Sequence, residues 1–347
     1  MAAGPTNLKT IAHWGVVAAA IALSACSNPN EPAQNPPAPT ITCPANMTTR
    51  GVPGSGQPVT YPPPTVTGGA SPVTTTCTPA SGTSFIVGTT AVSCTTADAA
   101  SRQAQCSFTV TLTPMLVSVT KYVAFGDSLT EGQNGRPGLH GERIVDVPNA
   151  YPTKLQSSLN LEYPGQGITV PNYGKGGEPI DDKAIERLRG ILANEKPAAV
   201  LLLDGYNNMF STCAPGVSNT SECSQKITDV GFGIRDLIRT AKRSEYGVRY
   251  IFVSTMTPPG PYLGIPPDRR IANDAIVRAN IGIANMVRAE GVTLVDTYPK
   301  FLGHEAEYVD QDGLHLRPAG YQAVADSFFA VIKTTVTTTP GFATRSN

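Results

Sequence analysis

Two patterns of apolar and polar positions divide the chain near residue 115. In the N-terminal part, apolar and polar residues alternate with a period of two. The clearest run sets apolar Cys106, Phe108, Val110 and Leu112 against polar Ser107, Thr109 and Thr111. This period is typical of strands that bury one face, and turn sequences such as GGASP and ASGTS separate the runs. We therefore predict a small all-β sandwich over residues 41–113.

From Val117 onward, apolar runs alternate with amphipathic stretches. The runs expected to form strands are residues 119–125, 168–173, 198–203, 249–254 and 292–296. Near-continuous apolar strands joined by helices indicate a parallel sheet that is covered on both faces. Residues 117–335 are therefore predicted to form a three-layer α/β/α domain around a five-stranded parallel sheet.

The expected helices carry apolar residues three and four positions apart, which places them on one face. These stripes are Ile227, Val230, Ile234, Leu237 and Ile238; then Ile276, Ala279, Ile283, Met286 and Val287, stopped by Gly291; then Tyr321, Val324, Phe328 and Ile332 after Pro318. Each stripe is wide enough to cover part of the sheet.

The first 26 residues have the form of an export signal, because one Lys9 precedes an apolar stretch too short to span a bilayer. The sequence LSAC at residues 23–26 resembles a bacterial lipobox, which implies removal of residues 1–25 and lipidation of Cys26. A plain signal peptide cut nearby is the alternative. Residues 26–40, rich in Pro and Asn, would form a tether of about 40 Å when extended. Residues 336–347 are expected to be a flexible tail.

Charge and cysteine content exclude some functions. Lys plus Arg and Asp plus Glu number 26 each, so no basic field favours nucleic acid as a partner. Without Cys26, six cysteines remain, and an even number in an exported protein implies disulfides. Four lie in the β unit, where three pairings are open: Cys43, Cys77, Cys94 and Cys106. Cys213 and Cys223 are expected to pair with each other.

Polar and glycine-rich segments follow the expected strands. The first strand ends in YVAFGDSLTEGQ, which places Ser128 just beyond its carboxyl end, where open parallel sheets bind ligands. Gly177 lies in PNYGKGGEP, and Asn207 lies in LLLDGYNNMF. In DQDGLHLRPAGY, Asp312 precedes His315 by three residues. All four segments are expected at one edge of the sheet.

Together these segments resemble the SGNH, or GDSL-type, hydrolase family of esterases and lipases, whose four motif blocks occur in order between Tyr122 and about Ile332. The resemblance implies a flavodoxin-like fold and catalysis without a cofactor. It assigns Ser128 as the nucleophile, Gly177 as the second-block glycine, Asn207 as the asparagine of Gly-x-Asn-Asp, and Asp312 with His315 as the final Asp-x-x-His. Asn208 departs from the aspartate of many members, and we interpret it as a change in local support.

Residue chemistry agrees with this resemblance. A serine hydroxyl needs a base, and a neutral imidazole is suited to that task near neutrality. His315 is the expected base, so turnover should fall as it protonates, and Asp312 would orient it. The oxyanion hole would consist of the Ser128 and Gly177 N–H groups and the Asn207 amide.

Other signals are weaker. His140 and His304 lack an aspartate three residues earlier and are expected to lie in loops or on the surface. GKGG lacks the spacing of a phosphate loop, and DQDG lacks the further acidic ligands of a calcium loop, so we predict no metal. Insertions at 209–224 and 257–270 are expected to rim the crevice. There, Tyr206, Phe210 and Tyr262 either line a sugar or acyl site or pack their own loops.

The N-terminal β unit resembles a hyalin-repeat (HYR) module, an immunoglobulin-like extracellular domain, over the run from TCPANMTT to CSFTVTL. The resemblance implies adhesion or spacing, with contact to a glycan or a protein. We see no catalytic constellation in it.

These observations lead to the hypothesis of a serine esterase that is lipid-anchored in the bacterial cell envelope, at the outer membrane or cell surface, or else secreted. Its substrate is expected to be a small ester or an acylated carbohydrate, because an adhesion-type module precedes the enzyme. A lysophospholipase, thioesterase or lipase is the alternative within the same class. A non-catalytic adhesive lipoprotein that uses its HYR module is the alternative from another class.

Overall fold

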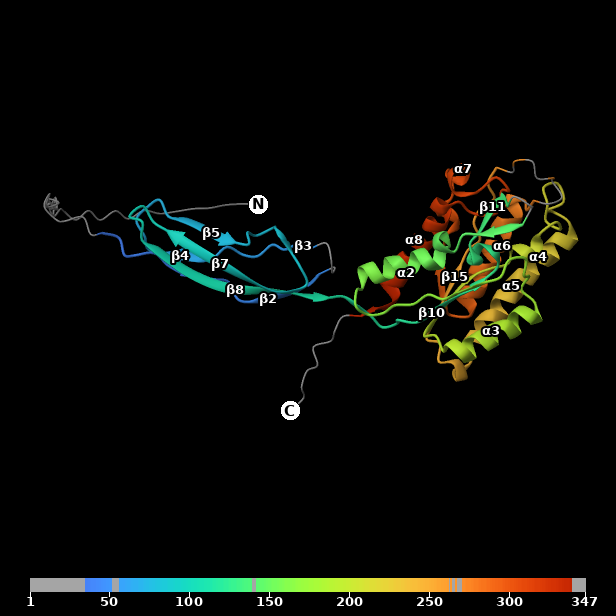
Figure 1. Ribbon diagram of the computed structural model, residues 1–347, viewed down its shortest axis with the longest axis horizontal. Helices are drawn as coiled ribbons and strands as arrows, with labels where there is room; N and C mark the ends of the chain where they lie inside the picture. Colours follow the sequence, from blue (N-terminus) through green and yellow to red (C-terminus); the bar gives the residue numbers. More distant parts are fainter. Residues whose placement is uncertain are drawn as a thin grey trace, which may run out of the picture.

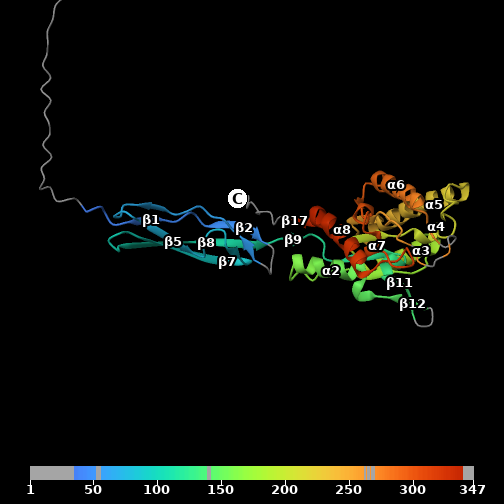
Figure 2. The same cartoon turned by 90° about the horizontal axis from the view of Figure 1, so that it is seen from above.

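The computed structural model describes residues 35–51, 56–138, 142–261, 263, 266 and 270–338. Figures 1 and 2 show two units: the N-terminal one consists of strands, and the long helices all belong to the second. The predicted signal peptide, Cys26, the first part of the tether, His140 and Tyr262 lie outside the described residues.

The N-terminal unit is a β-rich domain around a four-stranded sheet in the order β2-β8-β7-β5. Its strands are β2 (Met47–Gly51), β5 (Thr74–Thr78), β7 (Gly88–Ala97) and β8 (Gln103–Pro114). Two-stranded ladders join β1 (Thr40–Thr42) to β4 (Thr65–Thr67) and β3 (Gln57–Pro58) to β6 (Ser84–Phe85). Along β8, Phe108, Val110 and Leu112 are buried while their neighbours are more exposed, as the alternation predicts.

Two disulfides staple this domain, Cys43–Cys106 and Cys77–Cys94. They realise one of the three pairings that the sequence leaves open. Cys77 and Cys94 face each other across the antiparallel β5–β7 ladder. The register of these two strands therefore determines that this pair can form. The core is small, so covalent links are a natural source of additional stability.

The second unit is built on a five-stranded parallel sheet in the order β13-β10-β14-β15-β16, as predicted. The strands are β10 (Tyr122–Gly126), β13 (Asn172–Gly174), β14 (Ala199–Leu203), β15 (Tyr250–Ser254) and β16 (Thr293–Val295). Every residue of β10 and β14 is buried, because helices cover both faces. This order is that of flavodoxin-like sheets.

Helices on the two faces complete the three layers (Figure 1). They are α2 (Tyr151–Glu162), α3 (Asp182–Glu195), α5 (Ser221–Ala241), α6 (Asn273–Ala289) and α8 (Pro318–Val336). α2 packs against α8, and α5 packs against both α3 and α6. The predicted stripes are largely the buried faces of α5, α6 and α8. No helix within the described ranges is long and apolar enough to cross a membrane.

Shorter elements connect this framework. They are α1 (Ser128–Glu131), α4 (Tyr206–Met209), α7 (Glu305–Tyr308), the hairpin of β11 (Gln133–Pro137) and β12 (Arg143–Val145), and 3₁₀ helices at Val147–Asn149, Ser244–Tyr246 and Tyr298–Lys300. β9 (Leu116–Val117) pairs antiparallel with β17 (Thr337–Thr338), which brings the two ends of this unit together.

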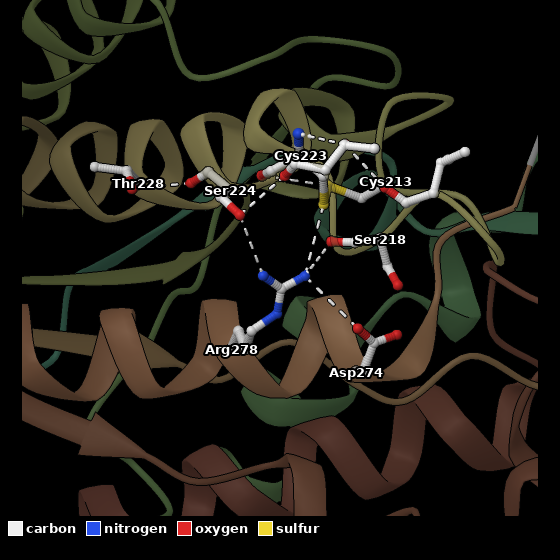
Figure 3. The surroundings of a disulfide bond; sticks show 9 residues. Cys213, Ser218, Cys223, Ser224, Thr228, Asp274 and Arg278 are labelled. Carbon is white, nitrogen blue, oxygen red and sulfur yellow. Dashed lines mark hydrogen bonds and ion pairs between the residues drawn. A yellow bond between two sulfur atoms is a disulfide. The ribbon is translucent and has the colours of Figure 1, made fainter.

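The insertion after α4 is fixed by a disulfide and by one arginine, as Figure 3 shows. Cys213 and Cys223 are bonded and fully buried. The Arg278 guanidinium, on α6, donates to the Ser218 carbonyl oxygen and lies 3.6 Å from an Asp274 carboxylate oxygen. The predicted pair therefore forms, and its loop is held against the neighbouring helix.

Candidate active site

Ser128 begins α1 directly after β10, at the end of the strand where the sheet order reverses. The Asp127 carboxylate caps this short helix by accepting from the Leu129 N–H at 3.0 Å. Only glycine fits at 126, because an added Cβ atom would lie 1.9 Å from the Leu203 carbonyl oxygen and 2.4 Å from Thr130 Oγ1. The apolar run of β10 therefore ends in a glycine because β14 and Thr130 leave no room for a side chain at that position.

Ser128, His315 and Asp312 form a continuous hydrogen-bonded chain. His315 Nε2 lies 2.8 Å from Ser128 Oγ, although the two residues are 187 positions apart. His315 Nδ1 lies 2.5 Å from Asp312 Oδ2. The other Asp312 oxygen accepts from the backbone N–H groups of Leu314 at 3.0 Å and His315 at 2.9 Å, which fixes the carboxylate. This geometry can carry a proton from the hydroxyl to the imidazole.

Asp312 is held in its charged form. Burial alone would raise its pKa, but the hydrogen bond and charge of His315, with the N–H groups of Leu314 and His315, lower the pKa below its usual value. An ionised Asp312 can accept a hydrogen bond from the Nδ1–H of His315, which leaves Nε2 free to accept the serine proton. The carboxylate also stabilises the imidazolium that forms during attack.

Gly177 lies in the loop after β13, and Asn207 lies in α4, which is hydrogen-bonded to that loop. Gly177 adopts a φ of 78°, which favours glycine, and no atom lies within 4 Å of the position that a Cβ would take. Asn207, in α4, donates one amide hydrogen to the Glu178 carbonyl oxygen at 3.2 Å. This bond joins Asn207 to the residue that follows Gly177.

Two hydrogen bonds to Ile180 explain why an asparagine stands at position 208, where many family members have aspartate. Its Nδ2 donates to the Ile180 carbonyl oxygen at 3.2 Å, and its Oδ1 accepts from the Ile180 N–H at 2.9 Å. An ionised aspartate could accept from that N–H but could not donate to the carbonyl. Asn208 therefore anchors the loop of Gly177 in both directions.

An ion pair that the sequence reasoning missed supports the same loop. Arg187 donates from Nε to the buried Glu178 carboxylate at 2.8 Å and from Nη1 to the Tyr173 carbonyl oxygen at 2.7 Å. Its guanidinium carbon lies 4.1 Å from the centre of the Phe125 ring, beneath the nucleophile. A signal was present: Arg187 falls within the buried stripe of Ala184, Leu188 and Ile191 on α3, where a charge needs a partner.

Other candidate residues take no part in the hydrogen-bonded chain of Ser128, His315 and Asp312. His304 is 53% exposed and bonds Glu307, so it does not join Ser128. Tyr206 is buried, with its hydroxyl 3.0 Å from Thr257 Oγ1, which is a packing role. Phe210 is 40% exposed at the insertion.

Comparison with known proteins agrees with this geometry. Residues 124–323 match the GDSL-like Lipase/Acylhydrolase family, and residues 35–112 match the HYR domain. The chain therefore belongs to the GDSL-like lipase/acylhydrolase family and is an esterase-type hydrolase with an HYR domain before its catalytic domain.

Individual relatives are distant. The spore germination lipase LipC of Bacillus licheniformis is 25% identical over 221 residues, which cover 60% of this chain and 95% of LipC. The structure of the native M. smegmatis aryl esterase is 16% identical, with a TM-score of 0.48. The match covers 61% of this chain and 98% of that one. For Axe2, an acetylxylan esterase from Geobacillus stearothermophilus, the identity is 20% and the TM-score 0.46, with coverage of 62% and 95%.

Proposed function

We propose that this esterase hydrolyses carboxylic esters through Ser128, His315 and Asp312, with an oxyanion hole of the Ser128 and Gly177 N–H groups and the Asn207 amide. The observation that carries the proposal is the 2.8 Å contact between Ser128 Oγ and His315 Nε2. A nucleophile, its base and the group that orients the base then form one chain.

The steps follow from these positions. As Oγ bonds to the ester carbonyl carbon, its proton passes to His315 Nε2, and the carbonyl oxygen becomes an oxyanion facing the three donors. Collapse of the intermediate breaks the ester C–O bond, and the leaving alcohol takes the proton from His315. Water then attacks the acyl-serine by the same route, which releases the acid and restores the hydroxyl.

Substitution of the nucleophile tests this proposal. Ser128→Ala should lower kcat for p-nitrophenyl acetate roughly a million-fold, because the acyl acceptor is lost. Ser157→Ala is a matched control, since Ser157 is exposed on α2 and bonds only the Thr153 carbonyl oxygen. Equal rates for Ser128→Ala and the wild type would refute the proposal and leave the HYR module as the carrier of function.

For the substrate, we infer a short acyl ester on a carbohydrate. An HYR module next to the enzyme, of a type associated with extracellular adhesion, would keep the active site near a polymeric surface. The likeness to LipC, which is described as a lipase, favours a lipid ester as the second candidate. Comparing kcat/KM for acetylated xylo-oligosaccharides with that for lysophospholipid and long-chain esters separates the two. Higher kcat/KM on the lipids would overturn the carbohydrate assignment.

We also propose that Cys26 is lipidated and anchors the protein in a bacterial cell envelope. The support is the LSAC sequence behind an export signal. Metabolic labelling with radioactive palmitate should mark the wild type and not Cys26→Ala, which should appear in the soluble fraction. Equal labelling of both proteins would contradict the anchor.

A further inference from the structure

Two aspartates lie side by side behind the nucleophile. β10 and β14 run parallel, and their ladder ends with Gly126 opposite Leu203. The next residue on each strand is an aspartate, Asp127 on one and Asp204 on the other. Their exposed fractions are 0% and 1%, so neither carboxyl group reaches solvent. No step of the proposed mechanism uses Asp204.

Each of these carboxyl groups has one satisfied oxygen and one orphan. Asp127 Oδ1 accepts from the Leu129 N–H at 3.0 Å, and Asp204 Oδ1 accepts from the Gly205 N–H at 2.7 Å. Oδ2 of Asp127 and Oδ2 of Asp204 are both buried without a hydrogen-bond partner. Two ionised carboxylates cannot satisfy each other, because both only accept. A single proton shared by the two side chains would supply the donor that both orphan oxygens lack.

We propose that Asp127 and Asp204 share a single proton at neutral pH, carried by Asp204, whose carboxylic O–H donates to the Asp127 carboxylate. The pair then bears one negative charge instead of two. Asp127 is held from both sides, by Asp204 and by the Leu129 N–H of the helix that it caps. Asp204 is thus a positioning residue for the turn that presents Ser128.

Charged neighbours decide which carboxyl group keeps the proton. Burial raises the pKa of Asp127 to about 6, but the Leu129 N–H and the charge of His315 act in the opposite direction. Burial and the Asp127 charge raise the pKa of Asp204 well above its usual value, and Glu178 adds to this while Arg187 opposes it. Burial raises the pKa of the Tyr151 and Tyr321 phenols, and the charge of Asp127 raises it further. The proton therefore belongs on Asp204.

Loss of this proton would oppose catalysis. When Asp204 ionises at alkaline pH, two adjacent anions lie beneath Ser128 as negative charge builds on the substrate oxygen. Turnover should therefore fall on the alkaline side. Stability should change in the same direction: a carboxyl group with a raised pKa stabilises the fold below its unfolded pKa and loses that contribution as pH rises through its folded pKa.

Infrared spectroscopy of the full chain tests the shared proton without any substrate. The wild type should show the C=O stretch of a protonated carboxylic acid at neutral pH, and titration to alkaline pH should remove it. Asp204→Asn should lack the band, because its amide donates to Asp127 permanently. Asp98→Asn is the control, since Asp98 is a buried carboxylate of the other domain, and it should keep the band. Absence of the band in the wild type, or its persistence in Asp204→Asn, would overturn the proposal.

The pH profile of kcat on p-nitrophenyl acetate, scaled to the maximum of each protein, is the second readout and rests on the proposed function. The wild type should lose about tenfold or more at alkaline pH, while Asp204→Asn should stay flat. Equal alkaline falls in both would contradict the role of Asp204. A complete lack of turnover would instead sink the proposed function and leave the infrared result standing. If Asp204→Asn does not fold, the infrared titration of the wild type decides alone.

Discussion

Buried carboxyl groups in the two domains differ in how many hydrogen bonds they accept. Asp98, in the HYR domain, is 6% exposed and accepts from the N–H groups of Ala70, Ala100 and Arg102 and from the Arg102 guanidinium at 2.7–3.0 Å. Burial alone would raise the pKa of Asp98, but these donors lower it to about 2. Asp127, behind the nucleophile, keeps an oxygen without a partner.

The difference separates structure from chemistry. All the donors that bond Asp98 belong to the same domain as Asp98. The Arg102 guanidinium also donates to the Pro36 carbonyl oxygen at 3.0 Å, which holds the segment before β1 against the domain. In the catalytic domain, by contrast, one oxygen of Asp127 and one of Asp204 are buried without a hydrogen bond from a neighbouring group. A buried oxygen without a donor reduces stability unless a proton on the neighbouring carboxyl group supplies the missing hydrogen bond, as we propose for this pair.

The largest effect outside the nucleophile should come from Asp312→Asn. The amide cannot hold the Nδ1–H tautomer or balance the imidazolium, so kcat should fall by about 10⁴-fold. Thermal unfolding should change little, since the side chain keeps its size and an oxygen for the Leu314 N–H. Steady-state kinetics with circular dichroism checks both. A large loss of stability with little loss of kcat would place Asp312 with the structural carboxylates and break the comparison.

Asn207→Ala should have the next largest effect. One of three oxyanion donors is lost, which predicts a fall in kcat of about 10²- to 10³-fold with a smaller change in KM. Asn285→Ala, at an exposed position of α6, is the control and should leave both constants as they are. A rise in KM at constant kcat would show that Asn207 binds the ground state and is no oxyanion donor.

Asp98→Asn should have the smallest effect on turnover, namely none. A lowered pKa means that Asp98 stabilises the folded domain above its unfolded pKa, and that this contribution disappears as pH falls from about 4 towards 2. Hydrogen–deuterium exchange of peptides around residues 70 and 102 should be faster in the variant at neutral pH and should converge with the wild type near pH 2. Equal exchange at neutral pH would show that the closed network contributes no stability.

Periodicity predicted most of the catalytic fold, because its strands and helices bury continuous runs and stripes. It was least accurate at β13, expected over residues 168–173 but formed only by Asn172–Gly174. β13 is an edge strand, and before it the pairing is reduced to the single bridge between Lys121 and Thr169. The apolar run that predicted this strand therefore begins before the residues that pair continuously with β10.

The candidate site was predictable where short motifs carry the chemistry, as at Ser128 and at Asp312 with His315. The groups that support it were not, because their roles depend on partners in other elements. Asn208 looked like a departure until its two bonds to Ile180 were seen. Arg187 was not singled out in the sequence, and only its bond to Glu178, next to Gly177, reveals its role.

By itself, the sequence determined what local physical chemistry dictates: the alternation that makes strands, the stripes that make helices, six cysteines besides Cys26, and a serine, a histidine and an aspartate in strand-end motifs. Only the tertiary structure decided which groups meet. Tertiary packing brings Ser128 to His315, and strand register brings Cys77 to Cys94 and places Asp127 and Asp204 just beyond the ends of neighbouring strands. The reason is that hydrogen bonds, disulfides and charge interactions act over a few ångströms, whereas residues such as Ser128 and His315 are separated by 187 positions in the sequence.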